Sequence, residues 1–400
     1  MCVQIYKSLK IKFFFSSLKP VMMQVSKPEK GQHIQLKIDR LSSGGGRGVG
    51  RYKNLVVFVP LTAPGDEVKV EITKVKKSFL EAKIVEFTQP SSNRLEPPCP
   101  VFESCGGCSL QMLNYSEQLK EKEGFLDFAL KRLVEEETNF VREPIEPSPK
   151  KLRYRNRIQV HQKGQEIGFF KKQSHSLVSL EDCLITDKRI TDTFKSLSKE
   201  NTNRRVELAL NKKGDVVQAE GKLGPKEALF AQVNTELNSI LVDYVLKQAK
   251  SLGNMKSVFD LYSGSGNFSF PLAQIFPKAS VTGVELSEAS VEVAKKQSSV
   301  SNLTFHAKDV AVFLRDFLTQ NSNKVDLVLL DPPRQGLSKE VVSALLAFKP
   351  KNIFYISCDL ASATRDIELL KQGFVLKRAK AFDMFPQTDH LESFFHLALK

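Results

Sequence analysis

The spacing of hydrophobic residues changes along the chain, and each change predicts a different kind of structure. In residues 31–87, apolar and polar residues alternate over short stretches such as Ile34–Ile38 and Val68–Ile72. Such alternation is typical of strands that bury one face, and Pro64-Gly65-Asp66 is a turn signal between two of them. The length fits a small closed barrel of about five strands, a fold that can bind oligonucleotides, or a β module without a ligand.

A helical period and a second β-rich region follow the predicted barrel. Residues 88–112 are rich in Pro and Cys, so we expect no regular element there. Residues 115–133 carry leucines at helical spacing, which predicts an amphipathic helix. The residue pattern of 150–220 predicts a second β-rich segment.

From about Lys226 onward, short apolar runs alternate with segments of helical length. This alternation predicts a parallel, doubly wound α/β sheet, in which functional residues gather at the carboxyl ends of the strands. The expected strands are Ser257–Leu261, Ser280–Glu285, Leu303–Ala307, Val325–Leu330 and Asn352–Ser357.

The length of 400 residues is too great for one ordinary core, so several domains are expected. We expect residues 1–29 to be disordered or to contain a mis-annotated start, with translation beginning at Met22 or Met23. After them we expect three domains: a β-barrel over 30–88, a β-rich central domain over 89–225 and an α/β domain over 226–400. No apolar run approaches the ~20 residues of a membrane helix.

Positive charge is concentrated in the first half of the chain. The net charge is +14, of which residues 226–400 contribute only +2. A basic region joined to a nearly neutral one suggests a polyanion-binding part that feeds an active site, although solubility alone explains many basic proteins. Glycines within residues 44–50 predict a flexible loop around Arg47 and Arg51. The run Arg153–Arg157 encloses Tyr154, which suits phosphate contact with base stacking, or a solvated edge strand.

Three of the six cysteines, Cys99, Cys105 and Cys108, lie within ten residues, and Cys183 is a distant fourth. Four sulfur ligands suit a [4Fe–4S] cluster or zinc, and a group of three with a remote single favours the cluster. Their low density does not suit a disulfide-stapled secreted protein, so a cytoplasmic location is expected.

A candidate cofactor site follows the first strands of the α/β region. Gly264-x-Gly266 follows a strand, and Glu285 ends the next strand at a spacing suited to ribose hydroxyls. Ser269 stands where the nicotinamide fingerprint has its third glycine, so S-adenosylmethionine fits better than NAD. Asp331-Pro-Pro-Arg334 follows the fourth strand. Because Arg334 stands where an amino-methylating enzyme has an aromatic residue, a ring carbon is the expected target.

Cys358 and Glu392 are the candidate catalytic pair. Cys358 follows a buried apolar run, and Glu392 closes the stretch His390-x-Glu392. A thiolate that adds to a ring and a carboxylate that takes a proton are what covalent chemistry on a pyrimidine needs. A buried cysteine at the end of a strand, without catalytic function, is the alternative.

In combination these motifs resemble the bacterial RNA (uracil-5-)-methyltransferase family, in its branch that acts on 23S ribosomal RNA. That branch carries a TRAM domain, an RNA-binding barrel resembled here by the glycine–arginine loop and Val57–Pro60, and an iron–sulfur cluster. The resemblance runs from about residue 31 to residue 400. Its motifs are the four cysteines, Phe230-x-Gln232-x-Asn234, Asp260–Phe268, Asp331–Arg334, Ser357-Cys358 and His390-x-Glu392.

The resemblance implies a role for each of these residues. Cys358 would be the nucleophile, Glu392 the base, and the four cysteines the ligands of a [4Fe–4S] cluster. The S-adenosylmethionine site would be lined by Gln232, Tyr262, Gly264, Asn267, Glu285, Asp309 and Asp331. The chain departs from the family at Asp359-Leu360, where Asn-Pro is usual.

RNA is the implied partner, and we expect a monomer without an obligate protein partner. A transfer-RNA uracil methyltransferase and a non-catalytic RNA-binding or assembly factor are the alternative interpretations.

Overall fold

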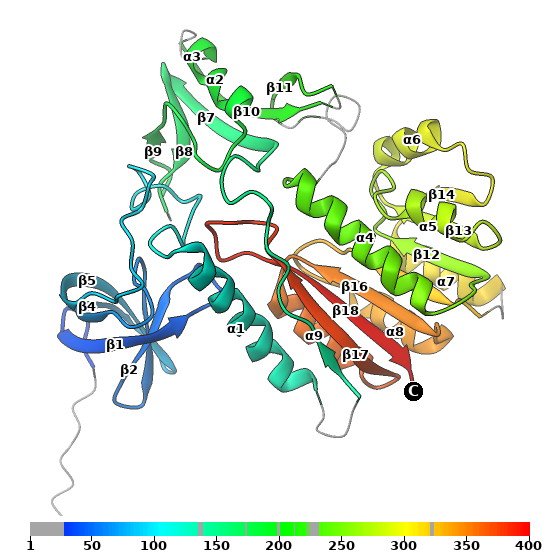
Figure 1. Ribbon diagram of the computed structural model, residues 1–400, viewed down its shortest axis with the longest axis horizontal. Helices are drawn as coiled ribbons and strands as arrows, with labels where there is room; N and C mark the ends of the chain where they lie inside the picture. Colours follow the sequence, from blue (N-terminus) through cyan, green and yellow to red (C-terminus); the bar gives the residue numbers. More distant parts are fainter. Residues whose placement is uncertain are drawn as a thin grey trace, which may run out of the picture.

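The computed structural model describes residues 28–134, 139–172, 174–197, 201–211, 213–221, 223, 232–320 and 324–400. Three sheets make up the β structure of these residues, and helices cover both faces of the largest one (Figure 1). Within these ranges, the helices include none with the length and apolar character that crossing a bilayer requires. The predictions for residues 1–27 and for Phe230 lie outside the described residues.

The first sheet is a closed barrel, as the period of two predicted. Its strands follow the order β1-β2-β3-β5-β4, and β4 pairs with β1. In β1, the buried Ile34, Leu36 and Ile38 alternate with exposed residues, so one face of the strand fills the barrel core. The strands are β1 (His33–Leu41), β2 (Gly48–Tyr52), β3 (Leu55–Val59), β4 (Glu67–Val75) and β5 (Phe79–Gln89).

The second sheet has five antiparallel strands in the order β11-β10-β7-β8-β9. Short helices α2 (Lys188–Asp192) and α3 (Phe194–Leu197) contribute Ile190, Phe194 and Leu197 to its core. The strands are β7 (Arg157–Gly164), β8 (Glu166–Phe170), β9 (Leu177–Ser179), β10 (Thr202–Leu210) and β11 (Val216–Glu220).

The third sheet has eight strands in the order β14-β13-β12-β15-β16-β18-β17-β6. The first five are parallel, β18 is antiparallel to both of its neighbours, and β6 runs parallel to β17. The strands are β12 (Ser257–Leu261), β13 (Ser280–Glu285), β14 (Leu303–Ala307), β15 (Leu327–Leu330), β16 (Asn352–Ser357), β17 (Phe374–Phe382), β18 (Glu392–Leu399) and β6 (Val141–Arg142).

Both faces of this sheet are buried, as a doubly wound fold requires. Successive residues of β16 point to opposite faces, so that Phe354 and Ile356 pack in one core and Ile353 and Tyr355 in the other. One face carries α4 (Thr235–Ser251), α5 (Ser269–Ile275) and α6 (Glu288–Gln297), and the other carries α7 (Val310–Gln320), α8 (Lys339–Phe348) and α9 (Leu360–Leu370). The predicted fold class is confirmed.

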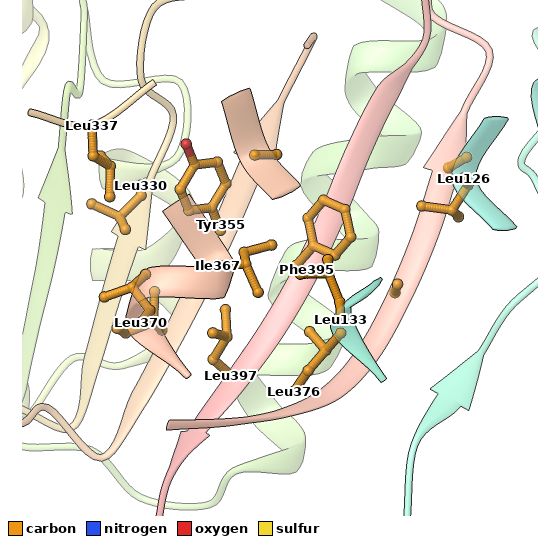
Figure 2. Close-up of a cluster of buried hydrophobic side chains, with 14 of the residues drawn as sticks. Leu126, Leu133, Leu330, Leu337, Tyr355, Ile367, Leu370, Leu376, Phe395 and Leu397 are labelled. Atoms are coloured by element: carbon orange, nitrogen blue, oxygen red, sulfur yellow. The ribbon is translucent and has the colours of Figure 1, made fainter. Parts of the chain in front are cut away.

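One helix from the first half of the chain also packs on this sheet. Helix α1 (Tyr115–Leu133) has the predicted bounds and contacts α9 and β17. Leu126 and Leu133 of α1 belong to the core cluster on this face of the sheet, and Figure 2 shows Leu133 beside Leu376 and Phe395. The segment between the barrel and the second sheet is therefore bound to the α/β sheet.

Candidate active site

Three strands of the large sheet bring predicted site residues together at the carboxyl ends of its parallel strands. Strand β16 ends at Ser357, so Cys358 is the first residue beyond it. Strand β18 begins at Glu392 and runs antiparallel to β16, with Ser393 opposite Ser357. This antiparallel register places Glu392 across from Cys358. Strand β15 runs parallel to β16 and ends at Leu330, so Asp331, the next residue, lies at the same end of the sheet as Cys358.

A cleft of about 970 Å³ opens at this end of the sheet. Residues from several strand ends, predicted separately from the sequence, converge on its wall. The predicted residues in the wall are Gln232, Tyr262, Gly264, Glu285, Asp309, Asp331, Cys358 and Glu392. Arg334 lies there too, together with Arg155, Leu286 and Phe385, which the sequence had not singled out for this site.

The turn after β12 is held in shape by hydrogen bonds to the next strand. Tyr262 has a φ of 66°, in the left-handed region that residues other than glycine seldom adopt. The Gly264 N–H donates to the Glu285 carboxylate at 3.1 Å, and the other oxygen of that carboxylate accepts from the Ser287 N–H at 2.8 Å. The turn and the carboxylate of Glu285 are thus fixed relative to each other.

Two other predicted cofactor residues have protein partners. Asp309 accepts a hydrogen bond of 3.1 Å from the Val312 N–H in the first turn of α7. Asn267 lines a small cavity of about 30 Å³ with Gln232 and Tyr262, and its side chain exchanges hydrogen bonds with Asn238. Asn267 does not reach the wall of the main cleft.

Burial in the cleft shifts the pKa values of Cys358, Asp331 and Glu392. Burial raises the pKa of the Cys358 thiol to about 11, and the charges of Glu392 and Asp331 add to the rise. Arg334 lowers the thiol pKa through its charge and a hydrogen bond. Burial also raises the pKa of Asp331 to about 7 and holds that of Glu392 well above its ordinary value. A carboxyl group with a pKa of about 7, as at Asp331, can exchange a proton near neutral pH.

Three buried side-chain oxygens in this region lack a hydrogen-bond partner among the described residues. They are Glu392 Oε1 in the cleft, Ser263 Oγ in the turn after β12, and Asp260 Oδ1 before it. A buried polar atom without a partner is costly, so such atoms mark places where a ligand completes the structure. Glu392 lines the cleft together with Gly264 and Glu285, and Ser263 lines the small cavity beside it. This polar lining fits a nucleoside-containing cofactor such as S-adenosylmethionine.

The comparisons with known proteins agree on one family. A model for tRNA (uracil-5-)-methyltransferases matches residues 216–400, and a TRAM-domain model matches residues 27–85. An uncharacterized RNA methyltransferase of Bdellovibrio bacteriovorus is 40% identical and covers 92% of this chain and 96% of the relative. A 23S rRNA (uracil(1939)-C(5))-methyltransferase of Shewanella woodyi is 32% identical and covers 90% and 94%. The chain belongs to the RNA (uracil-5-)-methyltransferase family.

The fold of this methyltransferase has a counterpart among solved structures. The crystal structure of Pyrococcus abyssi tRNA (uracil-54, C5)-methyltransferase in complex with S-adenosyl-L-homocysteine matches it with a TM-score of 0.67. The match covers 91% of this chain and all of the other, at 24% identity, so it is a likeness of fold. Family membership confirms the predicted RNA uracil-5-methyltransferase, its TRAM barrel and its use of S-adenosylmethionine.

The four predicted metal ligands of this methyltransferase lie together. Cys99, Cys105, Cys108 and Cys183 are free thiols that line one cavity of about 220 Å³. Burial raises the pKa of Cys108 to about 12, and the neighbouring thiols contribute to the rise. No group of three or more His, Cys, Asp or Glu side chains in the described part of the chain is placed to hold a single metal ion.

Asp359, which directly follows the candidate nucleophile, has a local structural role. Its side chain accepts a hydrogen bond of 2.8 Å from the Ser362 N–H and so caps the start of α9. Its own N–H donates to the Ser357 hydroxyl at 3.1 Å. A fixed turn therefore lies directly after Cys358.

Two expectations about RNA contact need correction. Tyr154 is buried and its hydroxyl donates to the Pro386 carbonyl at 3.1 Å, so it cannot stack on a base. Arg153 and Arg157 are paired with Asp182 and Glu207, and only Arg155 of the run reaches the cleft.

The glycine loop of the barrel is also not free. Its Gly45 N–H donates to the Asp389 carboxylate, so the loop is docked on the segment that leads to Glu392. The sequence offered no signal for this contact, because 344 positions separate the two residues.

Proposed function

We propose that this enzyme methylates carbon 5 of uridine in RNA through a covalent bond between Cys358 and the base. The placement of Cys358 opposite Glu392, on the wall of one cleft, carries the proposal. Carbon 5 of uracil is a weak nucleophile. Attack by the Cys358 thiolate on carbon 6 forms a sulfur–carbon bond and converts the ring into an enolate, which is nucleophilic at carbon 5.

Glu392, Arg334 and the cofactor take part in the reaction together with Cys358. When bound, S-adenosylmethionine supplies the electrophilic methyl group that carbon 5 accepts. Glu392 then removes the proton from carbon 5, and the electron pair of that bond expels the Cys358 sulfur from carbon 6. Arg334 stabilises negative charge on the thiolate, because it is the cation that lowers the thiol pKa.

Seven residues around the cleft are proposed to hold the cofactor. The carboxylate of Glu285 would accept from ribose hydroxyls, and the turn after β12 lets the cofactor lie close to the backbone. Asn267 would act by fixing this turn rather than by reaching the cleft. The set is Gln232, Tyr262, Gly264, Asn267, Glu285, Asp309 and Asp331.

Replacement of the two catalytic residues tests the proposal. Cys358→Ala should abolish methyl transfer and leave RNA binding intact. Glu392→Gln should trap a methylated protein–RNA adduct, since it removes the base that the elimination needs. The readout is a denaturing gel after incubation with ribosomal RNA and cofactor with a labelled methyl group. Glu220→Gln, an exposed change on β11, is the control. Absence of an adduct in Glu392→Gln would contradict covalent catalysis.

We propose 23S ribosomal RNA as the substrate, because a relative that spans almost the whole chain carries that activity in its name. The transfer-RNA enzyme with a similar fold supplies the alternative. Mapping 5-methyluridine in both RNA classes from a strain that lacks the gene separates the two. Loss of the modification from transfer RNA alone would contradict the proposal.

We further propose that Cys99, Cys105, Cys108 and Cys183 hold a [4Fe–4S] cluster. Four free thiols around one cavity form the donor set that such a cluster needs. When bound, the cluster would supply four metal–sulfur links that cross-link the loop of residues 99–108 to the segment around Cys183. Protein prepared without oxygen should contain iron and sulfide in equal amounts, and zinc in their place would contradict the assignment.

A further inference from the structure

Asp389 joins three parts of the molecule that are far apart in sequence. Its carboxylate accepts a hydrogen bond of 2.8 Å from the Gly45 N–H of the barrel and another of 2.8 Å from the Ser109 hydroxyl. The Ser109 oxygen in turn accepts from the Asp389 N–H at 2.8 Å. Asp389 and Ser109 are buried, with 6% and 8% of their surface exposed, so water competes little for these bonds.

We call the contact of Asp389 with Ser109 and Gly45 the joint. The barrel loop fits this joint only because it carries no side chain at Gly46. Gly46 has a φ of +59°, and a Cβ atom built on it would lie 2.8 Å from the Cβ of Ser109. A side chain at this position would be strained and would push the loop away from Ser109. The close approach of the barrel to the joint is therefore built into the sequence.

The segment that leads to Glu392, residues 383–391, depends on these outside contacts for its shape. Gln387 has a φ of 68°, and its carbonyl accepts from the N–H groups of Ser109 and Leu110 at 3.0 Å each. Its side-chain oxygen accepts from the Gln118 amide at 3.0 Å, and its own N–H donates to Gln118 at 3.1 Å. A strained residue persists where neighbouring contacts fix it from several sides.

One oxygen of the Glu392 side chain is not held by the part of the protein that the structure describes. This Oε1 atom is buried and has no hydrogen-bond partner among the described residues. The backbone therefore decides where this oxygen lies. Glu392 pairs with Phe382 as the first residue of β18, and Asp389, three residues upstream, fixes the segment that enters this strand. Fixing a catalytic group through its backbone is effective only when the backbone is itself anchored.

We propose that Asp389 is a positioning residue for the catalytic base, fixing Glu392 relative to Cys358 by tying its segment to Ser109 and Gly45. The inference rests on the proposed function, in which Glu392 removes the carbon 5 proton. Asp389 acts on the elimination step and not on the attack of Cys358, because Cys358 is carried by β16 and α9, which do not contain the joint. Loss of the joint should therefore leave adduct formation intact and slow its resolution.

The test compares Asp389→Ala and Ser109→Ala with the wild type in single-turnover reactions on ribosomal RNA from a strain lacking the gene. Both variants should accumulate the labelled methylated adduct, with its resolution slowed by up to about a hundredfold, the scale of a misplacement of about 1 Å. Ser109→Ala removes a single hydroxyl, so it keeps the test decisive if Asp389→Ala does not fold. Gly46→Ala, which breaks the joint from the barrel side, should give the same adduct.

Asp326→Ala is the matched control. Asp326 is also a buried aspartate that accepts backbone N–H groups, from Lys256 at 2.6 Å and Ser257 at 3.2 Å, but it lies at the start of β15, away from the cleft. This variant should lose stability without accumulating adduct.

Adduct and product lowered together in Asp389→Ala and Ser109→Ala would overturn the inference and leave the joint a structural contact. If Glu392→Gln itself forms no adduct, the covalent mechanism fails instead. The two failures are thus distinguishable in the same gel.

Discussion

The reactivity of Cys358 is limited by the burial that shapes its site. Burial and the carboxyl groups of Glu392 and Asp331 favour the thiol, and Arg334 is the group that favours the thiolate. With a pKa of about 11, the free enzyme holds little thiolate at neutral pH, and only the thiolate attacks carbon. A thiol that is mainly protonated in the free enzyme is protected from unwanted reaction.

Alkylation of Cys358 in the RNA-free enzyme should rise about tenfold for each pH unit between roughly 7 and 9, because the thiolate fraction rises in that proportion below the pKa. Arg334→Gln should slow alkylation at every pH in this range, since it removes the group that lowers the pKa. Iodoacetamide labelling, followed by mass spectrometry of the Cys358 peptide, measures the rate. A rate that begins to level off between about pH 8 and 9 would show a thiol of ordinary acidity and would contradict the raised pKa.

At the scale of elements, helix α1 fixes the first residue of the segment that leads to Glu392. Lys122, which is fully buried, forms an ion pair with the equally buried Asp383 and donates to the Phe385 carbonyl at 3.0 Å. The Tyr115 hydroxyl donates to the other Asp383 oxygen at 2.7 Å. Helix α1 and the joint at Asp389 thus hold the two ends of the same segment.

Lys122→Met should destabilise the enzyme by about 3–5 kcal/mol, because it leaves the Asp383 charge buried without its cation. The double variant Lys122→Met/Asp383→Asn should recover part of this loss, since it removes the unpaired charge. Urea unfolding measures both. Equal stability of the single variant and the wild type would mean that water reaches Asp383.

Local patterns predicted the elements well and their contacts poorly. The bounds of α1 and of four of the five expected strands in the large sheet follow from periodicity. The antiparallel strand β18, which brings Glu392 across from Cys358, was not predicted. Similarly, Lys122 looks like a solvated helix residue, because its partner Asp383 lies 261 positions away. The docking of Gly45 on Asp389 was hidden for the same reason. A glycine-rich sequence predicts a flexible loop as long as the surface against which the loop packs is unknown.

At the scale of the whole molecule, positive charge and chemistry occupy different parts of the chain. The excess charge lies in residues 1–225, whereas the wall of the cleft, apart from Arg155, comes from residues 232–392. A uridine in folded RNA must leave its stack to enter the cleft, which costs a few kcal/mol. Phosphate contacts to the basic part can offset this cost without touching the reacting base.

RNA binding should therefore weaken steeply with salt, because each phosphate contact releases counterions. If the enzyme contacts about six phosphates, its affinity should fall by up to about a thousandfold between roughly 50 and 200 mM salt. Fluorescence anisotropy with a ribosomal RNA fragment measures the slope, and Cys358→Ala keeps the measurement free of covalent adduct. Cofactor binding to the same protein is the control and should change little, because the cofactor carries no chain of phosphates. A flat response for RNA would place recognition in the cleft alone and remove the role assigned to the basic half.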